Sequence, residues 1–198
     1  MREGMRRNAK SVFADSLKEL AKTKPLDKIT VRDIVDNCGA GRQTFYNHFK
    51  DKYDLINWIY KTNAHTIWKT YIYTETWDKV IGRMLAHMKE NQAFYFRAIN
   101  DKGQNSFFDF LYEHTRVSYI KMIKKFFGED ALTNSLLFTI DLYCHGVLNM
   151  VKEWVGKGMK ESPELIAKNI YHNMPPDLKK FTNWKMSTIM PLIDKTES

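Results

Sequence analysis

The sequence predicts an all-α protein built from a small N-terminal domain and a larger helical domain. Apolar residues recur at helical spacing along the chain, and we see no strand-like alternation of apolar and polar residues. Only nine glycines and five prolines occur in 198 residues, mostly where a helical pattern ends. The chain is long enough for a core, and a hydrophobic content of 43% excludes a disordered chain.

The first two helices are predicted from amphipathic patterns with clear ends. The first pattern runs from Met5 to about Lys22, and Pro25 prevents its continuation because the residue before proline avoids helical geometry. Thr30 followed by Asp33 has the spacing of a capping box at the start of a second helix. The apolar face of that helix ends at Cys38.

A glycine-bearing turn separates the second helix from the third. Gly39 can adopt the left-handed conformation that ends a helix, and Gly41 can begin the next one, over residues 42–49. Asp51 is then the expected cap of a longer fourth helix that extends to about residue 70.

The rest of the chain shows longer helical patterns and then a firm stop. Ser162-Pro163-Glu164 is a helix start, with a cap, a proline in the first turn and an acid at the positive end of the helix dipole. Met174-Pro175-Pro176 ends the last pattern, and we expect a C-terminal tail over 177–198 with at most one short helix. The predicted helices lie near 77–90, 92–100, 105–127, 134–156 and 163–173.

The net charge of +8 and a pI near 9.3 favour an anionic partner, either nucleic acid or a membrane surface. An ordinary basic cytosolic protein would also fit. Residues 1–50 contain eleven Lys and Arg against six Asp and Glu, so the first quarter holds most of the excess.

Cysteine usage and the absence of targeting patterns predict a cytoplasmic protein. Cys38 and Cys144 lie far apart in apolar helical stretches, which predicts buried free thiols in a reducing compartment. The basic start has no apolar run of a signal peptide. The most apolar window, 136–155, contains Asp141, His145, Asn149, Lys152 and Glu153 and is too polar for a membrane span.

The stretch from Thr30 to Lys52 has the layout of a helix-turn-helix. A tight turn lets the first helix brace the second, which can then enter the major groove of DNA. Arg42 can bind guanine through a bidentate fork, and Gln43 can pair with an adenine edge. We therefore predict that the third helix reads bases.

The neighbouring polar residues predict contacts to phosphates or base edges. The free N–H groups at a helix start attract phosphate, so we expect Thr30, Arg32 and Lys52 to be phosphate contacts. Tyr46 could contact a phosphate or belong to the core. Phe45 and Phe49 should anchor the third helix. The predicted DNA-binding residues are Thr30, Arg32, Gly41, Arg42, Gln43, Thr44, Tyr46, Asn47, His48 and Lys52.

Residues 28–56, KITVRDIVDNCGAGRQTFYNHFKDKYDLI, resemble the helix-turn-helix signature of the TetR family of bacterial regulators. That signature ends its recognition helix in T-F-Y-x-H-F before a charged turn, as residues 44–52 do. The resemblance covers roughly residues 6–60 and implies an operator-binding homodimer. Gly41 departs from it, because the family often has a Ser or Thr cap there; glycine leaves a backbone N–H freer to meet a phosphate.

A second stretch, YCHGVLNMVKEWVGKGMKESPELIA over 143–167, resembles the last two helices of a TetR subgroup that includes the dihydroxyacetone-kinase regulator DhaS. This resemblance implies a protein coactivator as an alternative to a small-molecule effector. The predicted domains are a helix-turn-helix domain over 1–52, a helical dimerisation and effector-binding domain over 53–176 and the tail over 177–198.

The helix over 134–156 is apolar around most of its circumference, which requires burial on two sides. The protein's own core can cover one side, and a second subunit is the natural cover for the other. A central helix in a monomer is the alternative. The predicted dimer-interface residues are Leu148, Val151, Val155, Ile166 and Ile170.

An effector pocket is predicted where histidines lie on apolar helix faces. His114 could orient a ligand, although a hydrogen-bonded core histidine is the alternative, and the same holds for His87. Trp68 and Trp77 could line a pocket or belong to the core. The candidate pocket residues are Met84, His87, Phe107, Phe110, His114 and Tyr143.

We find no catalytic motif, no phosphate-binding glycine loop and no metal-ligand spacing in the sequence, so we expect no enzyme activity, cofactor or metal. The sequence predicts a DNA-binding transcriptional regulator that acts as a homodimer on double-stranded DNA, by family default a repressor. An activator with a protein coactivator is one alternative. A helical ligand-binding or adaptor protein that does not read DNA is another.

Overall fold

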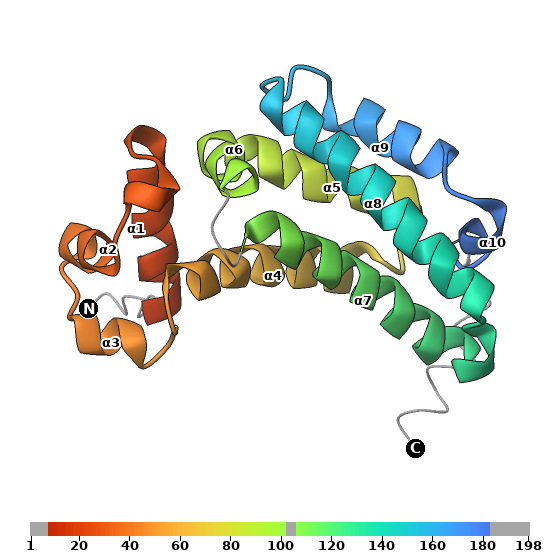
Figure 1. Cartoon of the computed structure of the whole chain (residues 1–198), viewed down its shortest axis with the longest axis horizontal. Coiled ribbons are helices and arrows are strands. Elements are labelled where there is room, and N and C mark those ends of the chain that lie inside the picture. Colours follow the sequence, from red (N-terminus) through yellow and green to blue (C-terminus); the bar gives the residue numbers. More distant parts are fainter. Residues whose placement is uncertain (1–7, 102–105, 183–198) are drawn as a thin grey trace, which may run out of the picture.

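The computed structural model describes residues 8–101 and 106–182, and within them every regular element is a helix, as predicted. A small head of three helices lies at one end of a larger helical body (Figure 1). The head contains α1 (Ala9–Thr23), η1 (Leu26–Lys28), α2 (Val31–Cys38) and α3 (Arg42–Tyr46). The body contains α4 (Lys52–Tyr71), α5 (Trp77–Glu90), α6 (Gln92–Asn100), α7 (Phe107–Phe127), η2 (Glu129–Ala131), α8 (Asn134–Gly156), α9 (Pro163–His172) and α10 (Pro176–Lys179).

The predicted helices and the observed ones agree closely from α4 to α9, and three differences stand out. The two 3-10 turns, η1 and η2, are too short to leave a helical period in the sequence. Helix α3 ends at Tyr46 and not at Phe49, because the chain turns there toward α4. The predicted start of the first helix at Met5 lies outside the described residues, and Asn8 caps α1.

The predicted helix ends are confirmed in atomic detail. Thr30 and Asp33 form a reciprocal capping box at the start of α2. Gly39 ends α2 in the left-handed conformation with φ +67°. Asp51 accepts hydrogen bonds from the first free N–H groups of α4, and Ser162 caps α9. Local sequence signals therefore fix where these helices begin and end.

Aromatic side chains form the core of the head. The Phe13 ring of α1 packs edge-on against Phe45 of α3, with ring centroids 5.2 Å apart, and against Phe49 at 6.5 Å. The buried Ser16 hydroxyl donates to the Ile34 carbonyl of α2 at 2.7 Å. The three short helices are therefore held as one unit, although none of them would be stable alone.

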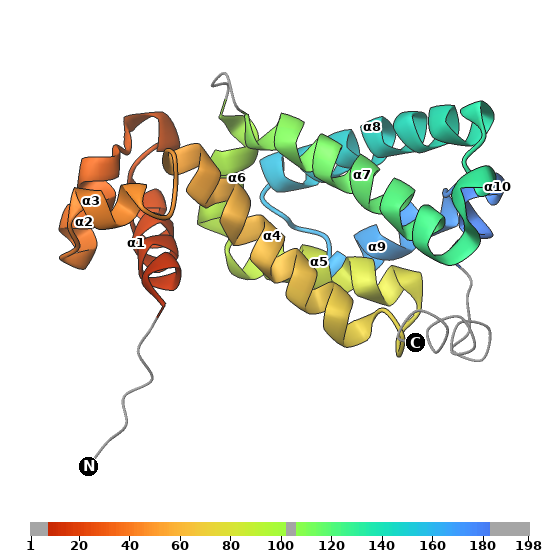
Figure 2. The ribbon, with the colours of Figure 1, turned by 90° about the horizontal axis from the view of Figure 1, so that it is seen from below.

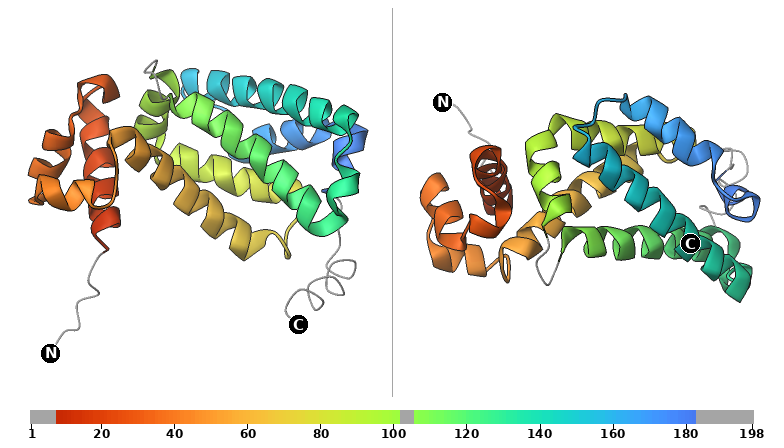
Figure 3. Two further views of the ribbon diagram at one scale, coloured as in Figure 1. Left: turned by 60° about the horizontal axis from the view of Figure 1, so that its bottom comes forward. Right: turned by 45° about the horizontal axis from the view of Figure 1, so that its top comes forward.

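Helix α4 leaves the head and runs along one side of the body (Figure 2). Helix α5 packs along α9, and α7 packs along α8, so that the body encloses a core between these pairs (Figure 3). The hydroxyl of Tyr143 on α8 donates to the Ile170 carbonyl of α9 at 2.8 Å and ties these two helices together.

Two hydrogen-bonded contacts join the head to the body. The ammonium of Lys52, at the start of α4, donates to the carbonyls of Leu26 in η1 and of Ile29, its C-cap. The Arg97 guanidinium of α6 reaches the Lys22 carbonyl at the end of α1, at 3.5 Å. Within the body, burial and then the nearby Asp101 carboxylate raise the pKa of Tyr53, which ties the start of α4 to the end of α6.

The chain after Pro175 is not a separate tail as far as it is described. Leu178 and Phe181 are buried, and Phe181 packs edge-on against Phe127 at the end of α7. These apolar side chains complete the core of the body, so the described residues after 177 pack with it, while the predicted domain division stays a prediction. Residues 183–198 lie outside the described part. Within 8–101 and 106–182, none of the helices has the length and apolar character needed to cross a membrane.

Candidate nucleic-acid interface

Helix α3 and its flanking residues present one buried and one exposed face. Phe45 and Phe49 are buried in the head, as predicted from their spacing. Tyr46 is 47% exposed, so its ring is not part of the core. The remaining predicted contact residues on this face are also exposed: Gly41, Arg42, Gln43, Thr44, Asn47 and His48.

Two side chains of α3 orient one another. The Gln43 amide nitrogen donates to the Asn47 side-chain oxygen at 3.1 Å, one helical turn away. This bond holds the Gln43 amide along the helix surface, and such preorganisation lowers the entropy lost when an adenine edge is bound. Arg42 lies in the first turn of the same helix, where a guanidinium can reach a guanine edge.

The turn before α3 has room for a larger residue at its cap. Gly41 has φ −84° in the extended region, and a Cβ there would meet only the Thr44 hydroxyl oxygen, at 3.7 Å. The cap makes no side-chain hydrogen bond. Gly39 is different, because its positive φ requires glycine.

Two of the predicted phosphate contacts are already engaged within the chain. The Thr30 hydroxyl and N–H both donate to the Asp33 carboxylate, at 2.8 and 2.7 Å. The Lys52 ammonium donates to the carbonyls of Leu26 at 2.6 Å and Ile29 at 2.9 Å. Both side chains thus hold the head together in this structure. Their role as phosphate contacts stays a prediction, and the proposed interface does not depend on it.

Arg32 lies on the exposed face of α2 and pairs with Asp36 one turn on, at 3.4 Å. Both side chains are largely exposed, so the pair is weak and can open when a phosphate approaches. Arg32 thus remains a candidate phosphate contact.

The body contains an apolar cavity of about 110 Å³ between α4, α5, α7 and α8. Three of the predicted pocket residues, Met84, His114 and Tyr143, line it. A much smaller hollow of about 10 Å³ lies next to it and is lined by His87 together with Tyr95. Burial lowers the pKa of His114, with the nearby ammonium groups of Lys61 and Lys121 acting in the same direction.

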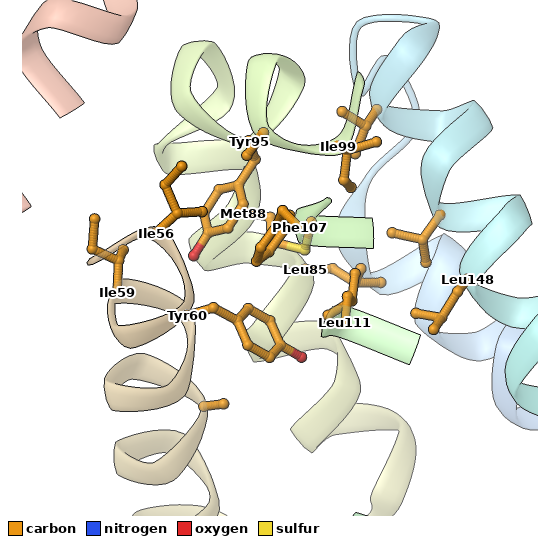
Figure 4. Close-up of a cluster of buried hydrophobic side chains, with 14 of the residues drawn as sticks. Ile56, Ile59, Tyr60, Leu85, Met88, Tyr95, Ile99, Phe107, Leu111 and Leu148 are labelled. Atoms are coloured by element: carbon orange, nitrogen blue, oxygen red, sulfur yellow. The ribbon is translucent and has the colours of Figure 1, made fainter. Parts of the chain in front are cut away.

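Phe107 and Phe110 were predicted to line the pocket, and they do not. Phe107 is buried against Tyr60 and Tyr95, with ring centroids 5.7 and 6.0 Å away (Figure 4). Helix α7 turns a different face to the cavity than its aromatic pattern indicates. Further cavity residues that the prediction did not include are mainly apolar: Tyr60, Val80, Ile81, Leu85, Met88, Leu111, Thr115, Ser118, Tyr119, Cys144, Val147, Leu148, Val151 and Ile170. Trp68 and Trp77 line it as well.

The structure turns most of the predicted dimer-interface residues inward. Leu148, Val151, Val155 and Ile170 are buried in the chain's own core, at 8% exposure or less, and Ile166 is half-buried. These four buried residues present little surface to a second subunit in this structure, and the predicted interface stays a prediction. The outward apolar side chains of α8 and α9 are Phe138, Leu142, Met150 and Leu165, which are 49–70% exposed.

The two cysteines are free, with Cys144 buried and Cys38 half-buried. Among the described residues, no group of His, Cys, Asp and Glu side chains is placed to hold a metal ion.

The head has the geometry of a helix-turn-helix DNA-binding domain. A braced third helix presents arginine and amide side chains on an exposed face, and a linking helix joins it to a larger helical body.

Comparison with known families places this arrangement more specifically. Residues 15–59 match the model described as bacterial regulatory proteins, tetR family. Residues 75–175, half of the chain, match a TetR C-terminal model described as transcriptional regulator C-terminal region. The chain belongs to the TetR family of transcriptional regulators, which confirms the resemblance seen in residues 28–56.

Two regulators named DhaS are similar to this chain. The transcriptional activator DhaS of the dhaKLM operon, from Lactococcus lactis subsp. lactis (strain IL1403), is 29% identical over 98 residues, which is 49% of this chain. The match spans about half of that relative's length, 52%. The solved structure of a dihydroxyacetone kinase operon activator DhaS matches with a TM-score of 0.62 and 22% identity, over 88% of this chain and 98% of that one.

A further solved structure shares the fold at lower sequence identity. The fatty acid degradation regulator FadR from Bacillus halodurans matches with a TM-score of 0.54 and 11% identity, over 88% of this chain and 96% of that one. At such identity the likeness concerns the fold.

Proposed function

We propose that this protein is a sequence-specific operator-binding regulator that acts as a homodimer. The observation that supports base reading best is the exposed face of α3, on which Arg42, Gln43 and Asn47 are presented by a helix anchored through Phe45. Arginine and amide side chains are the ones that distinguish guanine and adenine in the major groove.

The homodimer is supported by the apolar surface of α8 and α9. Four of the seven large hydrophobic side chains that are exposed among the described residues lie there: Phe138, Leu142, Met150 and Leu165. Gly146 lies between Leu142 and Met150 on α8, and a Cβ at that position would meet nothing within 4 Å. A helix from a second copy could therefore approach this surface closely.

DNA reading itself favours two copies. One recognition helix contacts only a few base pairs, which is too little to select an operator among genomic sites. Two heads related by a two-fold axis double the site, with recognition helices in major grooves about 34–36 Å apart.

The cavity supports a small-molecule effector, because apolar hollows with a few polar groups are the usual form of such sites. The relative from Lactococcus lactis is a transcriptional activator. For the direction of regulation, this favours activation over repression, which is the default expected for the family. A protein coactivator stays an alternative to the small effector.

Fluorescence anisotropy with the DNA upstream of the protein's own gene tests the proposal. We expect binding at least about a hundredfold tighter than to shuffled DNA of the same length at physiological salt. Equal affinity for both would contradict base reading and favour a helical ligand-binding or adaptor protein. Transcription from that DNA in vitro, with and without the protein, gives the direction of regulation.

A further inference from the structure

Of the buried side-chain atoms that lack a hydrogen-bond partner in the described part of the chain, two belong to residues that line the small hollow next to the apolar cavity. They are the Nε2 atom of His87 on α5 and the hydroxyl of Tyr95 on α6. Tyr95 is fully buried, and His87 is 20% exposed at its side chain. The two rings lie edge to face, 5.9 Å apart. Buried polar groups are rarely left unpaired, because leaving them so costs free energy.

Among the side chains that the structure describes, no charged one lines the hollow that these two atoms border. They border the hollow of about 10 Å³, whose other lining residues are Tyr60, Asn63, Ala64, Ile67, Met84 and Met88. The Asn63 amide nitrogen already donates to the Ile59 carbonyl at 2.7 Å. The nearest carboxylate to His87 is Glu90, 4.0 Å from Nδ1 and therefore beyond hydrogen-bond distance.

The small hollow and the larger cavity share three walls. Tyr60, Met84 and Met88 line both of them. Figure 4 shows Tyr60, Met88 and Tyr95 converging between α4, α5 and α6. Methionine side chains are flexible and fill irregular gaps, so a movement of Met84 or Met88 joins the two spaces. The joined space is mainly apolar, and His87 and Tyr95 bring polar atoms to its smaller part.

We propose that this space binds a small neutral alcohol whose hydroxyl bridges His87 Nε2 and the Tyr95 hydroxyl while its hydrocarbon part fills the apolar cavity. The proposal rests on the proposed role of the cavity as the effector site. A hydroxyl group can donate to an imidazole nitrogen and accept from a phenol at once, so one oxygen satisfies both atoms.

An ionised ligand does not fit this space. No Lys, Arg, Asp or Glu lines either hollow, so a carboxylate or ammonium would lose its hydration without gaining a counter-charge. Burial together with the charge of Lys18 lowers the pKa of His87, which keeps its ring neutral at pH 7. The size also limits the ligand, since an apolar cavity of about 150 Å³ is known to hold benzene.

A single buried water is the alternative occupant, because about 10–15 Å³ is enough for one. In that case the two polar atoms have a structural role, and no ligand of the cavity would depend on the Tyr95 hydroxyl.

The test uses 1-hexanol as the probe, the full-length protein free of DNA and titration calorimetry at pH 7.5. We expect saturable binding of 1-hexanol and at least about hundredfold weaker binding of hexanoate, which has the same chain length and a charge. Tyr95→Phe removes one oxygen and should weaken 1-hexanol binding about tenfold, and His87→Leu should do the same.

Tyr112→Phe is the matched control. Its ring stacks on His145, with ring centroids 4.1 Å apart, and it lines neither hollow, so loss of its hydroxyl should change 1-hexanol affinity by less than about twofold. Circular dichroism checks that each variant keeps its fold. The proposal is overturned by absence of saturable 1-hexanol binding, by equal binding of hexanoate, or by Tyr95→Phe binding like the wild type.

Operator binding is measured in parallel by anisotropy. A protein that selects its operator and does not bind 1-hexanol overturns only this inference. A protein that binds 1-hexanol through Tyr95 and does not discriminate operator from shuffled DNA contradicts only the proposed function.

Discussion

The Lys52 ammonium at the start of α4 lies 2.6 Å from the Leu26 carbonyl and 2.9 Å from the Ile29 carbonyl, at the end of η1. A helix N-terminus with a lysine looks like a phosphate site in the sequence. In the structure this lysine instead donates to backbone carbonyls of η1 and its C-cap; the Leu26 carbonyl accepts from the Ile29 N–H as well. Lys52 thereby fixes where the head sits on the first turn of α4.

Lys52→Met should therefore lower the stability of the fold more than it affects DNA binding per folded molecule. The apolar stem is kept, but the charged hydrogen bonds are lost, and we expect unfolding to become easier by about 1–3 kcal/mol in urea. Lys50→Met is the control, because Lys50 is exposed. If Lys52→Met unfolds like the wild type and its DNA binding has a lower salt slope, Lys52 is a phosphate contact after all.

The capping box of α2 should give the protein an acid-sensitive contact. Hydrogen bonds from Lys24 and Thr30 hold the pKa of Asp33 well below its ordinary value of 3.8. Because folding favours the ionised form, this contribution is complete above that value and is lost as pH falls through the lower folded-state pKa.

We therefore expect Asp33→Asn to lower the melting temperature at pH 6, and the difference from the wild type to shrink toward about pH 2–3. Asp36→Asn, in the exposed pair with Arg32, is the control and should change the melting temperature little at either pH. A difference at Asp33 that grows on acidification would contradict the assignment of the carboxylate as the stabilising form.

The N-terminus of α3 has no side-chain cap, so a substitution that supplies one should make the folded protein more stable. Gly41→Ser places a hydroxyl where it can accept from an early N–H of α3, and the site has room for the added Cβ. We expect a gain of a few tenths of a kcal/mol, up to ~1 kcal/mol, in denaturant unfolding. Gly39→Ser is the contrasting variant and should destabilise, since that residue has φ +67°. Equal effects at both glycines would contradict this account.

The helices could be read from the sequence because their signals are local. Thr30 with Asp33, Gly39, Asp51 and Ser162 each mark a helix end through bonds within a few residues. The family signature in residues 28–56 also lies within one short stretch. None of this depends on how distant parts of the chain meet.

The errors concern contacts between residues distant in sequence. Lys52 meets carbonyls more than twenty residues away, which no local pattern shows. Helix α8 is apolar around most of its circumference, so periodicity cannot distinguish the buried Val151 from its exposed neighbour Met150. Helix α7 likewise has apolar residues on several faces. Which of these faces lines the cavity depends on how α5 and α8 pack against it, and the sequence of α7 alone does not show this.

Base reading by α3 predicts two different mutant behaviours. Arg42→Ala and Gln43→Ala should each weaken operator binding by about 1–3 kcal/mol and relax the preference at one position of the site. Arg32→Ala should weaken operator and shuffled DNA alike and reduce the salt slope by about one. Binding-site selection on random DNA measures the preference, and an unchanged selected sequence for Arg42→Ala would leave that residue as a phosphate contact only.

The final prediction concerns assembly through α8 and α9. Leu142→Glu combined with Met150→Glu places two charges on the exposed apolar surface. In a dimer these carboxylates would be buried between the subunits without partners, which opposes association. In a monomer they stay in water and should change the stability of the fold little. We expect the wild type to sediment as a dimer and the double variant as a 23.4 kDa monomer with unchanged helical circular dichroism. The monomer should lose operator affinity because it presents a single head.

Val151→Glu separates this surface from the core beneath it. Val151 is 4% exposed, so a carboxylate there would be buried without a partner and should destabilise the fold by more than about 4 kcal/mol, before any effect on assembly is seen. The two variants therefore fail in different ways, one by dissociation and the other by unfolding. A double variant that still sediments as a dimer, or a wild type that is monomeric at micromolar concentration, would show that the exposed face of α8 does not hold two copies together.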